Sequence, residues 1–95
     1  MEITAGTRVV AARDQVSTEL EGEAVILNLA DQVYYGLDPV GARVWALIRQ
    51  PRTVAELRDA IVSEYEVDGP TAELDIISLL TQLAERRLVD VVAAV

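Results

Sequence analysis

The chain lacks cysteine, histidine and lysine. Without cysteine it can form no disulfide and offers no thiolate as a nucleophile or metal ligand. Without histidine it lacks the usual general base near neutral pH and the commonest zinc ligand. These absences argue against an enzyme, and we expect a protein without catalytic residues.

Long apolar runs and targeting signals are also missing. No apolar run approaches the roughly 18–20 residues that a membrane-spanning helix needs. The opening residues, MEIT, have neither the basic segment nor the apolar core of a secretory signal. We therefore expect a cytoplasmic protein that does not bind membranes, and the Met1 start favours a discrete protein over a fragment of a larger enzyme.

Basic charge is scarce, with eight arginines against 16 acidic residues and a net charge of −8. The acids are spread along the chain, seven in residues 1–50 and nine in residues 51–95. A field of this sign repels nucleic acid and favours a cationic partner. Because 52% of the residues are hydrophobic, the composition favours a folded domain over a disordered chain. We expect a single domain over residues 1–95, with residues 1–7 loose.

Alternation of apolar and polar residues predicts strands in the first part of the chain. Val16, Thr18 and Leu20 alternate with polar residues, which predicts a half-buried strand that ends in a turn at Gly22. The short links between the later strands predict an antiparallel meander. The predicted strands cover residues 8–13, 16–21, 24–29 and 32–37.

Three helices are predicted after these strands. The first covers residues 39–49, with Asp38 as N-cap and Trp45 as a core anchor. The second begins with a capping box at Thr53-x-x-Glu56, and the third begins near Pro70. Residues 88–95 form an apolar tail that we interpret as a final strand. The predicted fold class is α+β and resembles a winged helix-turn-helix domain, with a three-stranded antiparallel sheet followed by three helices.

The block YYGLDPVGARVWALI resembles the PqqD-like family of RiPP recognition elements, small domains that bind leader peptides of ribosomally made, modified peptides. The resemblance runs from residue 16 to residue 89 and rests on the order and spacing of its parts. Arg87 departs from it, because many members have glycine before the final apolar pair. The stretch from Val33 to Asp38 looks most like the stand-alone leader-binding proteins of lasso-peptide biosynthesis. Further parts are the helix start at 53–57, the helix end at 65–68, Asp75, Leu79-Leu80, Leu83 and Leu88-Val89.

The resemblance implies leader binding by strand addition to the strand over residues 32–37, in the groove against the third helix. The last strand of a meander independently offers a row of unpaired N–H and C=O groups to an added peptide. Tyr34 and Tyr35 face opposite sides of this strand, so one should be exposed and the other should line the sheet–helix interface.

The third helix supplies the other wall of this groove. Leu79 and Leu83 are expected to form its apolar floor, with Asp75 and Arg86 at its ends. Apolar residues at helical spacing usually belong to the core, so spacing alone would place Leu79 and Leu83 there. The family resemblance favours the groove instead. The expected peptide-binding residues are Gln32, Val33, Tyr34, Tyr35, Asp75, Ile76, Leu79, Gln82, Leu83 and Arg86.

For the lasso subfamily the resemblance implies two partners: a separate cysteine peptidase that removes the leader, and an ATP-dependent cyclase downstream. An alternative within the same family is the pyrroloquinoline quinone chaperone, which presents its precursor to a radical SAM enzyme. Neither interpretation requires the domain itself to carry a cofactor, and we expect none.

An alternative from another functional class is a winged-helix regulator that binds DNA. Its third helix would have to read the major groove, but here that helix carries Glu73, Asp75 and Glu85. We therefore expect no nucleic-acid partner. The acids between Glu64 and Asp75 mimic the spacing of an EF-hand calcium loop. The first two acids are Glu where the motif needs Asp or Asn, and the twelfth position holds Asp where it needs Glu, so we expect no metal.

Overall fold

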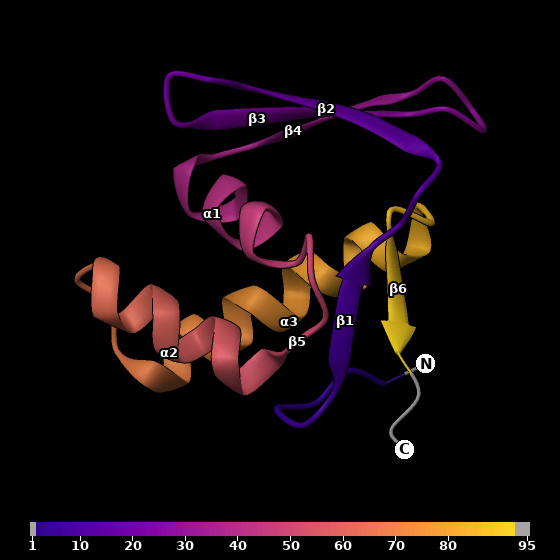
Figure 1. Cartoon of the computed structure of the whole chain (residues 1–95). Coiled ribbons are helices and arrows are strands. Elements are labelled where there is room, and N and C mark those ends of the chain that lie inside the picture. Colours follow the sequence, from indigo (N-terminus) through magenta and orange to yellow (C-terminus); the bar gives the residue numbers. More distant parts are fainter. Residues whose placement is uncertain (1, 93–95) are drawn as a thin grey trace.

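The computed structural model describes residues 2–92, arranged as two small sheets around three helices (Figure 1). One sheet has the strand order β2-β3-β4 and lies above α1, and the other has the order β5-β1-β6. The elements in chain order are β1 (Arg8–Ala11), β2 (Gln15–Leu20), β3 (Glu23–Asn28), β4 (Tyr34–Leu37), α1 (Pro39–Leu47), β5 (Arg52–Thr53), α2 (Val54–Glu64), α3 (Gly69–Glu85) and β6 (Val89–Val92).

The predicted antiparallel meander is confirmed as the β2–β3–β4 sheet. Leu20 pairs with Glu23 across a two-residue turn, in which Glu21 and Gly22 have φ angles of 51° and 83°. Positive φ at both positions is typical of a type I′ turn, and Gly22 adopts it without steric cost. This turn fixes the register of β2 on β3, and the register decides which side chains share a face.

The prediction that Val16, Thr18 and Leu20 form a buried face is wrong. Val16 is 57% exposed and Leu20 is 62% exposed. The helices instead cover the face that carries Ala24 and Ile26, which are buried. Residues paired across antiparallel strands share a face, and Val16 pairs with Leu27, on the side opposite to Ile26. Alternation predicts two faces but does not say which of them a helix covers.

The predicted helix starts are confirmed. The Gly41 N–H donates to Asp38 Oδ1 at 2.8 Å, and Thr53 and Glu56 make both bonds of the capping box. The third helix begins one residue early, at Gly69, where the Thr71 N–H donates to Asp68 Oδ1 at 2.8 Å. These bonds satisfy N–H groups that have no partner within the helices.

A left-handed residue ends α3. Arg87 has a φ of 59°, and its N–H donates to the Ala84 carbonyl at 3.0 Å. The next N–H, of Leu88, donates to the Leu83 carbonyl at 2.9 Å, which completes a Schellman motif. An arginine therefore occupies a conformation that glycine adopts more easily. Both leucines are buried, so the turn also directs the chain from α3 into β6.

The second sheet joins segments from both ends of the chain. Strand β1 confirms the predicted strand near residue 8, and β6 confirms a strand in the tail up to Val92; residues 93–95 of that prediction lie outside the described part. The pairing of β1 with the short β5 was not predicted. The expectation of a loose segment at residues 1–7 is wrong for the described residues 2–7. Ile3 is buried, and the Thr7 carbonyl accepts the N–H of Val54 at 3.0 Å.

One apolar cluster connects both sheets and all three helices. Trp45 is fully buried in it, which confirms the predicted core anchor. Within residues 2–92, no helix is both long enough and apolar enough to cross a membrane.

Candidate functional site

The open edge of β4 is the first part of the site. Strand β4 pairs with β3 on one side, and the described part of the chain places no strand on its other side. The Asn28 N–H donates to the Val33 carbonyl at 3.0 Å, which turns the carbonyl of Val33 toward β3. The directions of the N–H and C=O groups alternate along a strand. The backbone groups of Tyr35 and Leu37 therefore also point toward β3, and those of Tyr34 and Gly36 point toward the open edge.

The strand begins later than predicted, at Tyr34 and not at Gln32. Gln32 has a φ of 60°, and its N–H donates to the Asn28 carbonyl at 2.8 Å. The Val33 N–H donates to Asp31 Oδ1 at 3.0 Å. Gln32 and Val33 thus form the β3–β4 turn, and their N–H groups already have partners. The edge that is open to an added strand lies at Tyr34 and Gly36.

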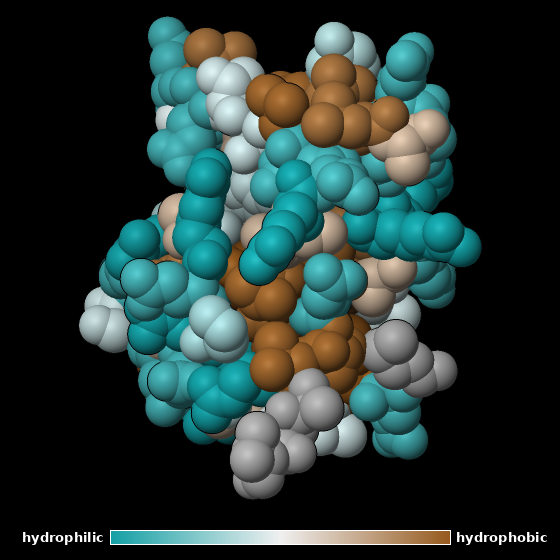
Figure 2. Space-filling view, turned by 45° about the vertical axis from the view of Figure 1, so that its right-hand side comes forward, coloured by the Kyte–Doolittle hydropathy of each residue, from teal (hydrophilic) through white to brown (hydrophobic). Residues whose placement is uncertain are grey.

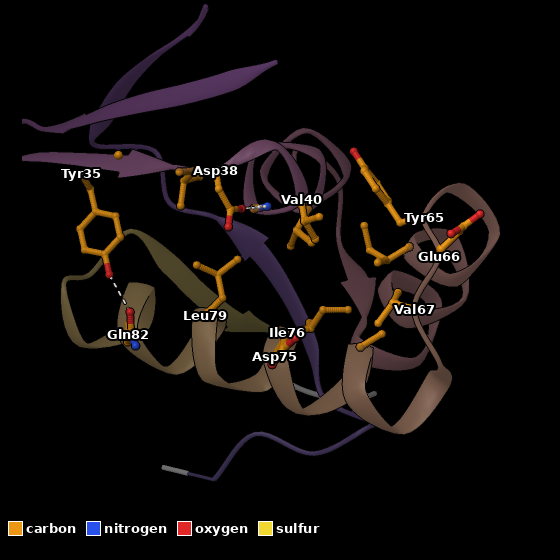
Figure 3. A pocket seen from close by; sticks show the side chains of 16 residues that line it. Tyr35, Asp38, Val40, Tyr65, Glu66, Val67, Asp75, Ile76, Leu79 and Gln82 are labelled. Carbon is orange, nitrogen blue, oxygen red and sulfur yellow. Dashed lines mark hydrogen bonds between the residues drawn. The ribbon is translucent and has the colours of Figure 1, made fainter. Parts of the chain in front are cut away.

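The two tyrosines of β4 point to opposite faces, as predicted. Tyr34 is 69% exposed on the face away from the helices. Tyr35 is half-buried, and its hydroxyl donates to Gln82 Oε1 on α3 at 2.8 Å (Figure 3). This bond spans the space between the edge strand and the helix.

A cavity of about 620 Å³ lies between β4, α1 and α3. Figure 3 shows Leu79 directed into it from α3, with Tyr65 and Val67 at the end opposite to Tyr35. Its inner wall is apolar and includes buried residues of three helices, Val44, Ile61 and Ile76. The full lining is Tyr35, Gly36, Leu37, Asp38, Val40, Gly41, Val44, Ile61, Tyr65, Glu66, Val67, Ala72, Asp75, Ile76, Leu79 and Gln82. The cavity is large enough for one or more apolar side chains of a peptide on the open edge of β4.

The lining carries charge of one sign only. Asp38, Glu66 and Asp75 contribute carboxylates, and no arginine lines the cavity. Asp38 also caps α1, so one of its oxygens is committed to the Gly41 N–H. The remaining carboxylate oxygens make this cavity attractive to cationic or hydrogen-bond-donating groups.

Five of the ten predicted site residues line the cavity: Tyr35, Asp75, Ile76, Leu79 and Gln82. Three others lie along or before the open edge but outside the cavity: Gln32, Val33 and Tyr34. The last two, Leu83 and Arg86, lie beyond Gln82 on α3 and line no part of it.

The expectation that Leu83 lies on the floor of the groove is corrected by its burial, because it is 0% exposed. Leu83 continues the core stripe of Ile76 and Leu80 along α3, whereas Leu79 lies at the margin of that stripe and stays half-buried. The side chain of Arg86 is exposed, and the contact that this residue makes with the sheet is through its carbonyl.

Asn28 is a positioning residue that the sequence analysis missed. It is a buried polar residue, 5% exposed, and its Nδ2 donates to the Arg86 carbonyl at 2.7 Å. Its Oδ1 accepts the Ala30 N–H at 2.9 Å, within the β3–β4 loop. The amide thereby joins the end of the sheet to the end of α3. The signal for it was a polar residue in alternation with Ala24 and Ile26, on the inner face of β3.

Within residues 2–92, no cluster of three or more histidine, cysteine, aspartate or glutamate side chains could hold a metal ion. The clear pKa shifts of acids lie outside the cavity. The Thr71 N–H lowers the pKa of Asp68, and hydrogen bonds with Thr53 lower the pKa of Glu56. The site therefore offers hydrogen bonds, apolar contacts and negative charge.

An open-edged antiparallel sheet beside an apolar cavity defines the class: a small α+β, winged-helix-like domain suited to hold a peptide. The chain belongs to the PqqD family, because residues 23–89 match the family described as coenzyme PQQ synthesis protein D. The predicted resemblance and fold class are thus confirmed.

Two solved structures are also similar to this chain. The structure of "TbiB1 in complex with the TbiA(β) leader peptide" is 38% identical, with a TM-score of 0.81, over 90% of this chain and 99% of that one. "Lasso peptide synthetase B1 complexed with the leader peptide" is 23% identical, with a TM-score of 0.76, over 86% of this chain and 96% of that one, and it supports the fold. No curated protein is significantly similar to this chain.

Proposed function

We propose that this protein binds the leader peptide of a ribosomally made precursor and does not itself catalyse a reaction. The observation that carries the proposal is the open edge of β4 beside the 620 Å³ apolar cavity. The similarity to TbiB1, whose structure holds a leader peptide, supports the same conclusion.

The leader would bind as an added strand on β4. The N–H and C=O groups of Tyr34 and Gly36 would pair with its backbone, which gives affinity with little dependence on sequence. Alternate side chains of the added strand would point toward α3, since side chains of a strand alternate between faces. Apolar side chains would enter the cavity against Leu79 and Ile76, and this contact would give specificity.

The role in the pathway follows from a binding domain without its own chemistry. We propose that it holds the leader so that a separate cysteine peptidase can remove it, with an ATP-dependent cyclase acting afterwards, in lasso-peptide biosynthesis. The absence of histidine and cysteine from the chain fits a protein that leaves catalysis to such partners.

A second candidate function is the chaperone of the pyrroloquinoline quinone precursor, and the description of the matching family favours it. The two candidates use the same groove and differ in the peptide that fills it. We rank the lasso function first, because the stretch from Val33 to Asp38 looks most like the stand-alone leader-binding proteins of lasso-peptide biosynthesis.

Titration of the purified protein with the leader encoded beside its gene tests the proposal. The matched control is a peptide of the same composition in scrambled order. Saturable binding of the leader, with a much weaker signal from the scrambled peptide, is the expected result. Equal affinity for the two peptides would contradict it, and preference for a quinone-precursor peptide would support the second candidate.

A further inference from the structure

The face of the β2–β3–β4 sheet that points away from the helices is apolar. Register places Val16 opposite Leu27, and Leu27 opposite Tyr34, so these side chains form one surface. The solvent-facing side of an antiparallel sheet is ordinarily polar. We define the outer sheet face as Val16, Thr18, Leu20, Val25, Leu27 and Tyr34, with Gly36 opposite Val25 and one charged residue, Glu23, opposite Leu20 at its end.

Large exposed apolar side chains gather here more than elsewhere in residues 2–92. Val16, Leu20 and Tyr34 belong to the outer sheet face, and two more, Leu29 and Val33, lie at the β3–β4 turn. The others are scattered over separate elements: Val62, Leu74 and Val91. In Figure 2 apolar surface lies along the upper part of the molecule, where Figure 1 places this sheet. Contiguous apolar surface of this kind marks an interaction site.

The charge around this surface selects the kind of partner. Residues 15–37 contain no arginine or lysine; of their acids, Glu23 lies on the outer face opposite Leu20, Glu21 and Asp31 lie in the flanking turns, and Glu19 lies on the inner face. Glu21 and Glu23 lie at the turn between β2 and β3, and Asp31 lies at the opposite end of the sheet. A second copy of this chain would bring like charges together at these ends. An apolar surface bordered by basic residues fits better.

The outer sheet face adjoins the leader site without entering it. Tyr34 points outward and Tyr35 points to the cavity, from neighbouring positions of β4. A partner on the outer sheet face would therefore lie next to a leader strand on the open edge and leave the cavity free. Both could bind at the same time.

We propose that the outer sheet face docks the enzyme that processes the bound precursor, through an apolar surface bordered by arginine or lysine. This inference rests on the proposed function, because it takes the separate peptidase as the partner. Strand addition would then serve the leader, and the flat face of the same sheet would serve the enzyme.

The test compares the wild-type protein with a Val16→Ser/Leu20→Ser double variant. Both residues lie on β2, on the far side of β3 from the open edge, so leader binding should not change. Leu74→Ser is the matched control, because Leu74 is 70% exposed on α3 and lies outside the outer sheet face. The probe is the purified peptidase, titrated by calorimetry with leader present, and each variant is also titrated with leader alone. Thermal unfolding checks that every variant folds.

We expect the double variant to bind the peptidase at least about tenfold more weakly, since a few central apolar contacts carry most of the affinity of an interface. Leu74→Ser should bind it like the wild-type protein. Glu23→Arg, a change at the end of the outer sheet face opposite Leu20, should also weaken peptidase binding, and less so at high salt.

Four outcomes would overturn the inference: no peptidase binding by the wild-type protein, unchanged binding by the double variant, an equal loss in Leu74→Ser, or a wild-type dimer that the double variant dissociates. Failure of the wild-type protein to bind leader would instead contradict the proposed function. The leader titration separates the two failures.

Discussion

The backbone direction along β4 gives the sharpest test of the proposed leader site. Gly36 turns its N–H to the open edge, and a Cβ atom built there would meet no atom within 4 Å other than those of its two chain neighbours. Gly36→Pro removes that donor and leaves the bonds between β4 and β3 intact. Proline is tolerated on an edge strand when its missing N–H faces outward, and it favours the extended conformation that Tyr35 already has.

The expected effect on binding follows from one lost hydrogen bond. The leader carbonyl that would pair with Gly36 is left without a donor, which costs about 1–3 kcal/mol, or roughly 5- to 150-fold in affinity. Gly36→Ala is the matched control, because it keeps the N–H and adds a methyl group in open space. We expect Gly36→Ala to bind the leader like the wild-type protein.

The assay pairs leader titration by calorimetry with thermal unfolding of the free protein. Since the N–H of Gly36 faces the open edge, its loss should leave the midpoint of unfolding of Gly36→Pro close to that of Gly36→Ala. Wild-type affinity in Gly36→Pro would refute strand addition at this position. A large fall in its unfolding midpoint would show that Gly36 faces β3, which would refute the register inferred from the Asn28–Val33 bond.

Three further predictions concern stability and the ends of the groove. Arg87→Gly relieves a φ of 59° and should raise stability by about 1 kcal/mol, seen as a midpoint about 4–8 °C higher; an unchanged or lower midpoint would contradict this. Asp75→Ala should weaken leader binding, whereas Arg86→Ala, outside the cavity, should not, and the reverse order would misplace the groove. Hydrogen bonds lower the pKa of Glu56 and of Asp68, so both acids stabilise the fold above their ordinary pKa of about 4, and this stability is lost as the pH falls through the lowered values. Unfolding midpoints measured from pH 7 to pH 2 should therefore decline below about pH 5, and Asp68→Asn, which keeps a cap but cannot ionise, should reduce the decline.

Local patterns predicted the parts of this fold that depend on local chemistry. Asp38 and the Thr53–Glu56 capping box mark helix starts, because each bond joins residues three apart. The pairing of β1 with β5 joins residues more than 40 positions apart, and no local pattern signals it. For the same reason the buried bond from Asn28 to Arg86 could not be expected.

Strand alternation and helical spacing placed some side chains of the candidate site correctly and misplaced others. Tyr34 and Tyr35 were correctly placed on opposite faces, because strand alternation requires it. Leu79 and Leu83 have the same residue type and lie four positions apart, yet only Leu79 reaches the cavity. Leu79 and Leu83 differ in exposure because of how α3 is rotated about its axis relative to the sheets. The spacing of apolar residues does not determine this rotation. The predicted burial of Val16 and Leu20 was wrong for a related reason, because which face of a sheet is buried depends on where the helices pack.

The burial of Trp45 has a consequence for spectroscopy. It is the one tryptophan of the chain, it lies wholly inside the core, and the cavity lining does not include it. Its indole emission should therefore be blue-shifted in the folded protein and should change little when a peptide fills the groove. Unfolding would expose the indole to water and shift the emission to longer wavelength. Intrinsic fluorescence thus reports the integrity of the core separately from occupancy of the groove, with no added label.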